Sequence, residues 1–145
     1  MRIERSQSFV DAFMALPMLR TLDAFYPDFE HWYVNTVVPG IVLGSDALIV
    51  AKEGQKIVGV ALGKRTASEI KLRCVRVIPA AQNTGLGIRL IDGMLEALMC
   101  DKPSCSVAEE MIHLYSRAFV TRYGFSLSAV DKGAYRPGKL EYRFN

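Results

Sequence analysis

Two glycines and a loop of small polar residues mark the segment of this sequence that is best suited to bind an anion. Gly85 and Gly87 follow Gln82-Asn83-Thr84, and they precede a run of apolar residues at helical spacing. The first N–H groups of a helix have no partner within it, and the helix dipole adds partial positive charge there. Glycines leave such N–H groups open because they carry no Cβ. The segment therefore predicts a phosphate or pyrophosphate cradle, with simple turn chemistry as the alternative.

Two common nucleotide-binding motifs are absent around these glycines. The sequence contains no G-x-x-x-x-G-K-[ST] run, which excludes a P-loop kinase or ATPase. A third glycine at the dinucleotide spacing is also missing, and the strand expected before the loop is not the first of a βαβ unit. The cradle therefore fits neither a P-loop nor a Rossmann site.

The strand expected before the loop changes its inward face partway along. Apolar residues stand at even positions from Ile70 to Cys74 and at odd positions from Val75 to Val77. A strand has a side-chain period of two, so the change of phase needs one extra residue. A β-bulge near Cys74-Val75 supplies it and leaves backbone groups unpaired at that point. The alternative is a strand that is buried on both faces at one end.

The strand end and the loop together read Val77-Ile78-Pro79-Ala80-Ala81-Gln82-Asn83-Thr84-Gly85-Leu86-Gly87. This run resembles the acetyl-CoA-binding motif of the GCN5-related N-acetyltransferases (GNAT), V-x-P-x-x-[RQ]-x-x-G-x-[GA]. A hairpin before the bulged strand and a later helix ending in Arg122-Tyr123-Gly124-Phe125 follow the order of that family. Sequence motifs of the family can be matched over residues 47–130. The N-terminal helices and the final strand match the family only in the order of the elements.

The resemblance implies a fold, a co-substrate and the residues that bind it. The fold is of the α/β (α+β) class, with a mixed, mostly antiparallel twisted sheet of about six or seven strands, a bulged central strand and about four helices. Acetyl-CoA is the co-substrate. The N–H groups of Gln82, Asn83, Thr84, Gly85, Leu86 and Gly87 hold its pyrophosphate, and the main chain of Val75 and Val77 pairs with its pantetheine arm. A free N–H near Val75 polarises the thioester carbonyl.

The catalytic side chains are less clear, because the sequence departs from the family pattern. Many members carry a tyrosine four residues before the Gly-Phe that ends the last helix, and Val120 stands there. Ser116 and Tyr123 lie one turn away on the same helical face and are the candidate proton donors, with packing as the alternative for Tyr123. His113 stands where many members of the family have an asparagine. The alternative to a role in the site is that His113 is an ordinary surface histidine. Tyr115 lies on a neighbouring face and is expected in the core.

Two places offer a carboxylate as the general base. Glu69 lies on the bulged strand, and Glu109-Glu110 lie where the last helix is expected to begin. Carboxylates at a helix start are also ordinary partners of the helix dipole. Because Glu69 alternates with Lys71 and Arg73, it is equally consistent with a solvated strand face.

The other elements follow from hydrophobic periodicity and turn residues. Residues 8–24 are predicted to be helical with a break at Pro17, and residues 29–43 to form a helix that stops near Pro39-Gly40. Two buried strands, 47–51 and 57–62, form a hairpin, and the last helix covers 109–123. Short strands are expected at 105–107, 126–130 and 140–144. Together with the resemblance, these elements predict one acyl-CoA N-acyltransferase domain over residues 1–145.

Composition bounds the function further. The 145 residues carry a net charge of +3. Residues 64–76 alone carry +4, which the rest of the chain partly offsets. This basic segment lacks the interleaved exposed aromatic residues of a nucleic-acid-binding site. The three cysteines lack metal-ligand spacing, so no metal is expected, and their odd count indicates reduced thiols. With no signal peptide and no apolar span, we expect a cytoplasmic protein that binds neither nucleic acid nor membranes.

The acceptor site is expected near the aromatic stretch Phe25–Tyr33 and the loop 134–139. Aromatic rings with acidic neighbours would favour a cationic amine, and packing of a helix against the sheet is the alternative explanation of the same residues. The two cations of the loop would favour an acidic acceptor or a partner protein. We therefore expect an acetyl-CoA-dependent N-acetyltransferase that acts by direct attack of an amine of a small molecule or protein. The alternative is a catalytically weak acyl-CoA-binding or regulatory module. The resemblance also favours a homodimer.

Overall fold

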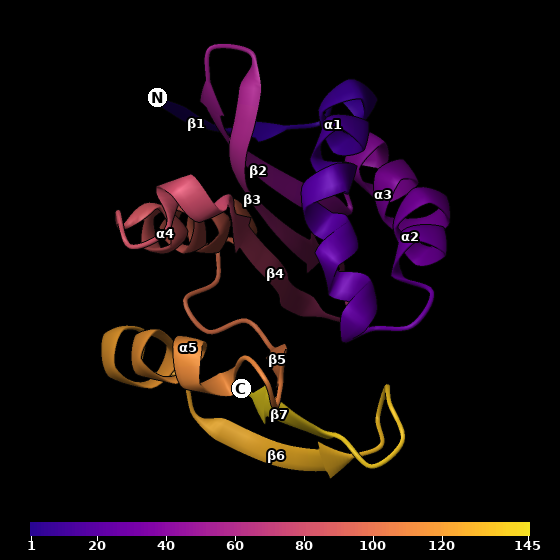
Figure 1. Cartoon of the computed structure of the whole chain (residues 1–145), viewed down its shortest axis with the longest axis vertical. Helices are drawn as coiled ribbons and strands as arrows, with labels where there is room; N and C mark the ends of the chain where they lie inside the picture. The colour runs from indigo at the N-terminus through magenta and orange to yellow at the C-terminus, as the bar shows by residue number, and fades with distance from the viewer.

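The computed structural model describes all 145 residues, which form two antiparallel sheets and five α-helices (Figure 1). The strands are β1 (Arg2–Ser6), β2 (Asp46–Glu53), β3 (Lys56–Arg65), β4 (Ile70–Val77), β5 (Cys105–Ala108), β6 (Leu127–Lys132) and β7 (Leu140–Phe144). The helices are α1 (Phe9–Leu19), α2 (Phe29–Trp32), α3 (Val38–Leu43), α4 (Leu86–Leu98) and α5 (Ile112–Ser116). Short 3₁₀ segments span Arg20–Ala24 and Pro79–Ala81, and π-helical segments span Tyr33–Val37 and Arg117–Arg122. None of the helices is long and apolar enough to cross a bilayer.

The first sheet has the order β1-β2-β3-β4 and is covered on both faces. Helices α1, α2 and α3 pack against one face, and α4 lies against the other (Figure 1). The inner strands β2 and β3 are therefore apolar on both faces, as the hairpin pattern predicted. The predicted turn of this hairpin is confirmed, since β2 ends at Glu53 and β3 begins at Lys56.

The second sheet has the order β5-β7-β6 and meets the first at a single point. Lys71 of β4 and Ser104 form an isolated parallel bridge, in which Leu72 N–H donates to Ser104 O at 2.9 Å. Beyond this bridge β4 and β5 are not paired with each other, so the two sheets diverge. The rest of the β4 edge is therefore free of a strand partner.

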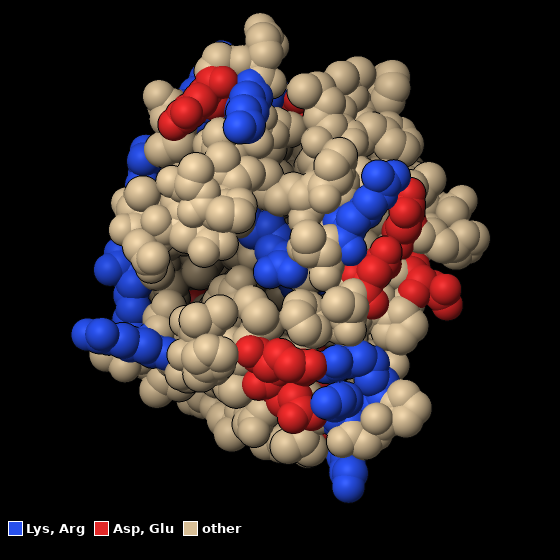
Figure 2. Space-filling view, viewed as in Figure 1, with Lys and Arg blue, Asp and Glu red and all other residues tan.

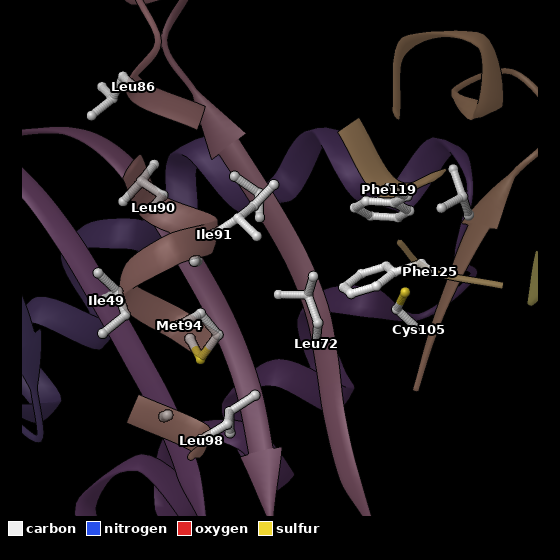
Figure 3. Packing of buried hydrophobic residues seen from close by; sticks show 14 of the residues in the cluster. Ile49, Leu72, Leu86, Leu90, Ile91, Met94, Leu98, Cys105, Phe119 and Phe125 are labelled. Carbon is white, nitrogen blue, oxygen red and sulfur yellow. The ribbon is translucent and has the colours of Figure 1, made fainter. Parts of the chain in front are cut away.

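Helix α4 closes one face of the first sheet with an apolar stripe at helical spacing (Figure 3). Its buried residues are Leu86, Leu90, Ile91, Met94 and Leu98. Gly59 and Gly63 of β3 allow this close approach, because a Cβ on Gly63 would lie 2.5 Å from Met94 Sδ and 3.1 Å from the Lys71 carbonyl oxygen. The same core continues to Phe119 and Phe125, which pack with the buried residues of the second sheet.

Gly63→Ala is expected to lower the free energy of unfolding by about 1–3 kcal/mol, because the added methyl group overpacks the α4 contact. Gly93→Ala in α4 is the matched control. Its Cβ would meet only Ile49 at 3.6 Å, an ordinary van der Waals contact. Since alanine is the better helix former, this control is expected to gain roughly 0.5–1 kcal/mol. Urea unfolding measures both changes, and equal stability of the two variants would contradict the packing described.

Two predicted helix breaks are wrong, and one strand was not predicted. Helix α1 runs through Pro17 and changes to a 3₁₀ turn only after Leu19. The second helical stretch also passes Pro39 and ends at Gly44, whose φ of 97° is left-handed. The π-helical turns before Pro39 widen the helix where a proline ring would otherwise meet a carbonyl group. Strand β1 pairs with β2 at the edge of the sheet, outside the predicted elements.

The bulge in β4 is confirmed, but it lies at Arg73, just before the predicted pair. Leu72 faces Gly63 of β3 and Cys74 faces Leu62, so Arg73 is the extra residue. The last helical stretch begins at Ile112, later than predicted, and Gly124 ends it with a φ of 66° as expected. The bulge matters for the site because it decides which backbone groups of β4 face the free edge.

Candidate functional site

Six consecutive backbone N–H groups are unpaired at the start of α4. The N–H groups of residues 83–88 make no hydrogen bond within the protein, and the first that pairs is Arg89 N–H, to Gly85 O at 3.1 Å. Gly85 has a φ of 83°, and a Cβ on Gly85 or Gly87 would meet nothing within 4 Å. The first turn of α4 carries no acidic side chain. This arrangement is an open cradle of positive potential that fits a pyrophosphate.

The free edge of β4 presents the main chain of Val75 and Val77 to the gap between the sheets. Before the bulge, Leu72 N–H points to β5. After it, the Val75 carbonyl accepts a hydrogen bond from the Tyr115 hydroxyl of α5 at 3.0 Å. The N–H and C=O of one strand residue point to the same side, so Val75 N–H also faces this gap, as does Val77 two residues on.

Two connected clefts open where β4 and β5 diverge. The smaller, of about 50 Å³, lies between the strands and ends at Val75 and Tyr115. The larger, of about 770 Å³, lies on the side of α2. Tyr26 and Ser106 line both clefts, as do Arg73 and Cys74, so these residues mark the junction. An acceptor in the larger cleft therefore has access to a group held along β4.

Basic side chains lie along this part of β4. In Figure 2, Lys and Arg side chains occupy the centre of the face, over β4 and beside the hollow between α4 and α5. Arg76 lines the smaller cleft, and its Nη2 donates to Thr21 Oγ1 at 2.9 Å. The charge excess of residues 64–76 thus lies partly where a polyanion would run toward the cradle.

A buried carboxylate stands behind the junction of the clefts. Glu141 of β7 is 4% exposed, and the Tyr26 hydroxyl donates to its Oε1 at 2.6 Å. Burial raises the pKa of the Glu141 carboxyl, and the hydrogen bonds from Tyr26 and Ser106 partly offset that rise. Both hydroxyls line the clefts, so they connect the carboxylate to the space where an acceptor would bind.

Glu69 is not part of this group. Its carboxylate is held by Lys64 and by Lys71, whose Nζ lies 3.2 Å away, and it lines neither cleft. These hydrogen bonds lower the pKa of Glu69 to about 2. Such a carboxylate is a weak proton acceptor at neutral pH.

The structure also keeps Ser116 and Tyr123 away from the clefts. Ser116 lines neither of them. The Tyr123 hydroxyl donates to Asp92 Oδ1 at 2.7 Å and to Ile88 O at 3.3 Å, so it joins the end of the last helical stretch to the first turns of α4. Burial raises the pKa of Tyr123 to about 12.

Glu109 and Glu110 hold the β6–β7 connection. Glu109 Oε1 accepts the Leu140 N–H at 2.8 Å, and Arg136 forms a two-pronged pair with Glu110 at 2.6 and 2.7 Å. That hydrogen bonding lowers the pKa of Glu110 to about 2. The acidic pair is therefore occupied within the protein, and so is Arg136, one of the two cations in the predicted loop.

The aromatic stretch is also occupied by the chain itself. Arg73 lies 4.8 Å from the centroid of the Trp32 ring, and Arg136 lies 5.5 Å from that of Phe25. Phe29 and Tyr33 are buried in the core. The rings expected to attract a cationic acceptor thus already hold guanidinium groups.

Sequence reasoning missed two residues at the centre of the site. Tyr115 packs against the core as expected, but its hydroxyl also reaches the Val75 carbonyl, which its register relative to the usual tyrosine does not indicate. The π-helical segment after Ser116 changes that register. Glu141 is not among the candidate residues of the sequence, although it lies within the strand expected at 140–144. That strand is β7, the middle strand of its sheet, and a polar residue in a central strand is the signal that could have identified it.

Comparisons with known proteins agree with this architecture. Residues 28–133 match the family model of the acetyltransferase (GNAT) domain. The structure is similar to a GNAT-family protein from Desulfovibrio desulfuricans, with 21% identity and a TM-score of 0.77, over 99% of this chain and 96% of that one. It is also similar to the PaiA N-acetyltransferase of Thermoplasma acidophilum in complex with coenzyme A, with 16% identity and a TM-score of 0.70, over 99% and 98% of the two chains.

A third similar structure is the ribosomal-protein-S18-alanine N-acetyltransferase of Escherichia coli. It has 15% identity and a TM-score of 0.68, over 99% of this chain and 92% of that one. At these identities the likeness shows a shared fold. No protein with a curated description matches the sequence.

Proposed function

Because the chain belongs to the GNAT acetyltransferase family, we propose that it transfers the acetyl group of acetyl-CoA to an amine by direct attack. The observation that carries this proposal is the row of six free N–H groups at residues 83–88, which continues the free edge of β4. A pyrophosphate fits the row, and an extended amide-containing arm fits the edge as an added strand would. Acetyl-CoA has both parts, and it supplies a thioester whose carbonyl carbon an amine can attack.

The chain's own groups then have separate roles. Asn83, Thr84, Gly85, Leu86, Gly87 and Ile88 form the pyrophosphate cradle with their free N–H groups, and Val75 and Val77 hold the pantetheine arm. Gln82 was also expected to donate to the pyrophosphate, but its N–H is taken by the Pro79 carbonyl at 3.2 Å. The Val75 N–H stabilises negative charge that develops on the carbonyl oxygen. Because that N–H lies in a narrow apolar cleft, the hydrogen bond is stronger there than in water.

The proton of the amine passes toward Glu141. Tyr26 or Ser106 accepts it at the cleft and gives its own hydroxyl proton to the carboxylate, so the hydroxyl is regenerated as the amine becomes neutral. The 2.6 Å hydrogen bond between Tyr26 and Glu141 is in place for this transfer. This assignment replaces Glu69 as the proton acceptor.

Tyr115 is assigned as the donor to the departing thiolate, in place of Ser116 and Tyr123. Its hydroxyl lies at the Val75 carbonyl, at the level of the free N–H. Burial raises the pKa of Tyr115, so the hydroxyl keeps its proton until a thiolate needs it.

Tyr115→Phe is expected to lower kcat by about 10²-fold and to leave acetyl-CoA affinity unchanged, because only the donated proton is lost. Tyr123→Phe is the matched control and is expected to stay within a few-fold of wild type, since its hydroxyl bonds to α4 outside the clefts. Steady-state thiol release measures both. The opposite order of effects would return the donor role to Tyr123.

The experiment that tests the function is a broad acceptor screen. Release of free coenzyme A thiol from acetyl-CoA is followed with small amines and amino acids, and with peptide N-termini, since one protein of the same fold acts on a protein alanine. Release that depends on the added amine is the expected result. Tight binding of acetyl-CoA with no amine-dependent release would instead identify an acyl-CoA-binding module.

A further inference from the structure

The charged side chains of the larger cleft are mostly cations. Lys71, Arg73 and Arg143 line it, against one acidic side chain, that of Asp28. Lys71 is paired with Glu69 at 3.2 Å, and Arg143 with Asp131 at 2.9 Å, so these two belong to exposed pairs at the rim. Arg73 is the least exposed member of the set, and its partner is the buried Asp46.

Arg73 is held in place with its outer nitrogens free. Its side chain is 16% exposed and lies over the Trp32 ring, and its Nε is 3.3 Å from Asp46 Oδ1. That Nε makes no hydrogen bond, and no side-chain or backbone acceptor pairs with the two terminal nitrogens. Arg73 lines the larger cleft, and a guanidinium that is held at its Nε end with both terminal nitrogens unpaired can bind a carboxylate by two parallel hydrogen bonds.

The position of Arg73 on β4 relates it to the reaction centre. It is the bulge residue, two positions before Val75, so the two backbones are on the order of 7 Å apart or less along the strand. Tyr26 and Ser106 line the cleft between them. One small molecule can therefore place an amine at these hydroxyls and a carboxylate toward Arg73.

We propose that the acceptor carries a carboxylate beside its amine, as an amino acid does, and that Arg73 binds this carboxylate. The inference rests on the proposed acetyl transfer and specifies its substrate class. A polycationic amine would meet Arg73 and the rim cations, and the Trp32 ring that could attract it is covered by Arg73. An anionic group gains from the same residues.

Trp32 supplies a direct readout, since it is the only tryptophan in the chain. The purified protein with saturating coenzyme A is titrated with N-acetylglycine, N-acetylalanine and N-acetylglutamate, which resemble products, and with the matched primary amides. At constant ionic strength, at least one acid is expected to change the Trp32 fluorescence saturably and to bind at least tenfold more tightly than its amide. Acetate alone, at the same concentrations, is expected to give no saturable change.

Arg73→Gln is expected to remove the preference for acid over amide, and Arg73→Lys to retain only part of it, because lysine keeps the charge without the fork. Arg122→Gln, an exposed arginine outside both clefts, is the charge-matched control and should keep the full preference. Equal binding of every acid and amide to the wild-type protein, or no binding by either, overturns the inference, whether or not the variants fold. A preference that survives in a folded Arg73→Gln also overturns it.

The proposed function fails by a different result. If acetyl-CoA itself does not bind, the transferase assignment is wrong. If acetyl-CoA binds and amines are acetylated while acids and amides are treated alike, only the carboxylate inference is wrong.

Discussion

Glu141→Gln is expected to lower kcat by about 10²–10⁴-fold while leaving the affinity for acetyl-CoA unchanged. The carboxylate accepts the amine proton through Tyr26 or Ser106, and an amide cannot accept it. Glutamine has nearly the same shape and still offers an oxygen to the Tyr26 hydroxyl, which now lies 2.6 Å from the carboxylate. The loss should therefore appear in turnover and not in the binding of acetyl-CoA.

The pH profile gives this prediction a second readout. Burial raises the pKa of Glu141 above the ordinary value of a glutamate. The carboxylate accepts a proton only when ionised, so kcat/KM of the wild-type protein should rise with pH through that raised pKa. In Glu141→Gln this limb of the profile should disappear.

Stability should respond in the opposite sense. A folded-state pKa above the unfolded value means that protonated Glu141 favours the folded state, so this contribution is lost as pH rises through the folded pKa. Glu141→Gln removes that loss. Its thermal midpoint at neutral pH should therefore be no lower than that of wild type, which separates lost catalysis from unfolding.

Glu69→Gln is the matched control, and it should stay within about twofold of wild-type kcat. Its carboxylate is paired with two lysines outside the clefts. If Glu69→Gln loses activity and Glu141→Gln keeps it, the proton acceptor is Glu69 and the relay through Tyr26 is wrong.

Gly87→Glu is expected to weaken acetyl-CoA binding by about 10²-fold or more. A carboxylate at this position would stand in the space beside the free N–H groups, which is now empty for at least 4 Å around the Cβ direction. Like charges 4 Å apart near a protein surface repel by about 4 kcal/mol, and the side chain also fills the cradle. Calorimetric titration with acetyl-CoA measures the change.

Gly87→Ala is the control for that variant. Its methyl group meets nothing within 4 Å, and the residue does not need a positive φ. Binding within about tenfold of wild type is expected, since one methyl group neither fills the space nor adds charge. Wild-type affinity in Gly87→Glu would show that the phosphates bind elsewhere.

The backbone part of the site could be predicted because it depends on local sequence. Glycines at a helix start expose N–H groups whatever the rest of the fold does, and the change of phase in β4 requires an extra residue. The observed bulge lies one position before the predicted one. The alternation of apolar residues shows that one extra residue is needed in the strand, but it does not show which residue is left unpaired. Both features lie within one strand, one loop and one helix.

The side chains of the site could not be predicted in the same way, because their positions depend on contacts between distant segments. Glu141 meets Tyr26 across 115 residues, and Tyr115 meets Val75 across 40. A helical wheel places Tyr115 away from the usual tyrosine position, and neither the π-helical segment nor its register is visible in the sequence pattern. Arg73 and Trp32 likewise meet only once α2 packs beside β4.

Amide chemical shifts of the isotope-labelled wild-type protein during a titration with acetyl-CoA test the central claim most directly. The backbone N–H groups of residues 83–88, with those of Val75 and Val77, are the ones left free for the co-substrate. These amides are expected to show the largest changes, and the changes should saturate at one equivalent of acetyl-CoA. No saturable change, or changes confined to other surfaces, would contradict the assignment of this cradle and strand edge as the acetyl-CoA site.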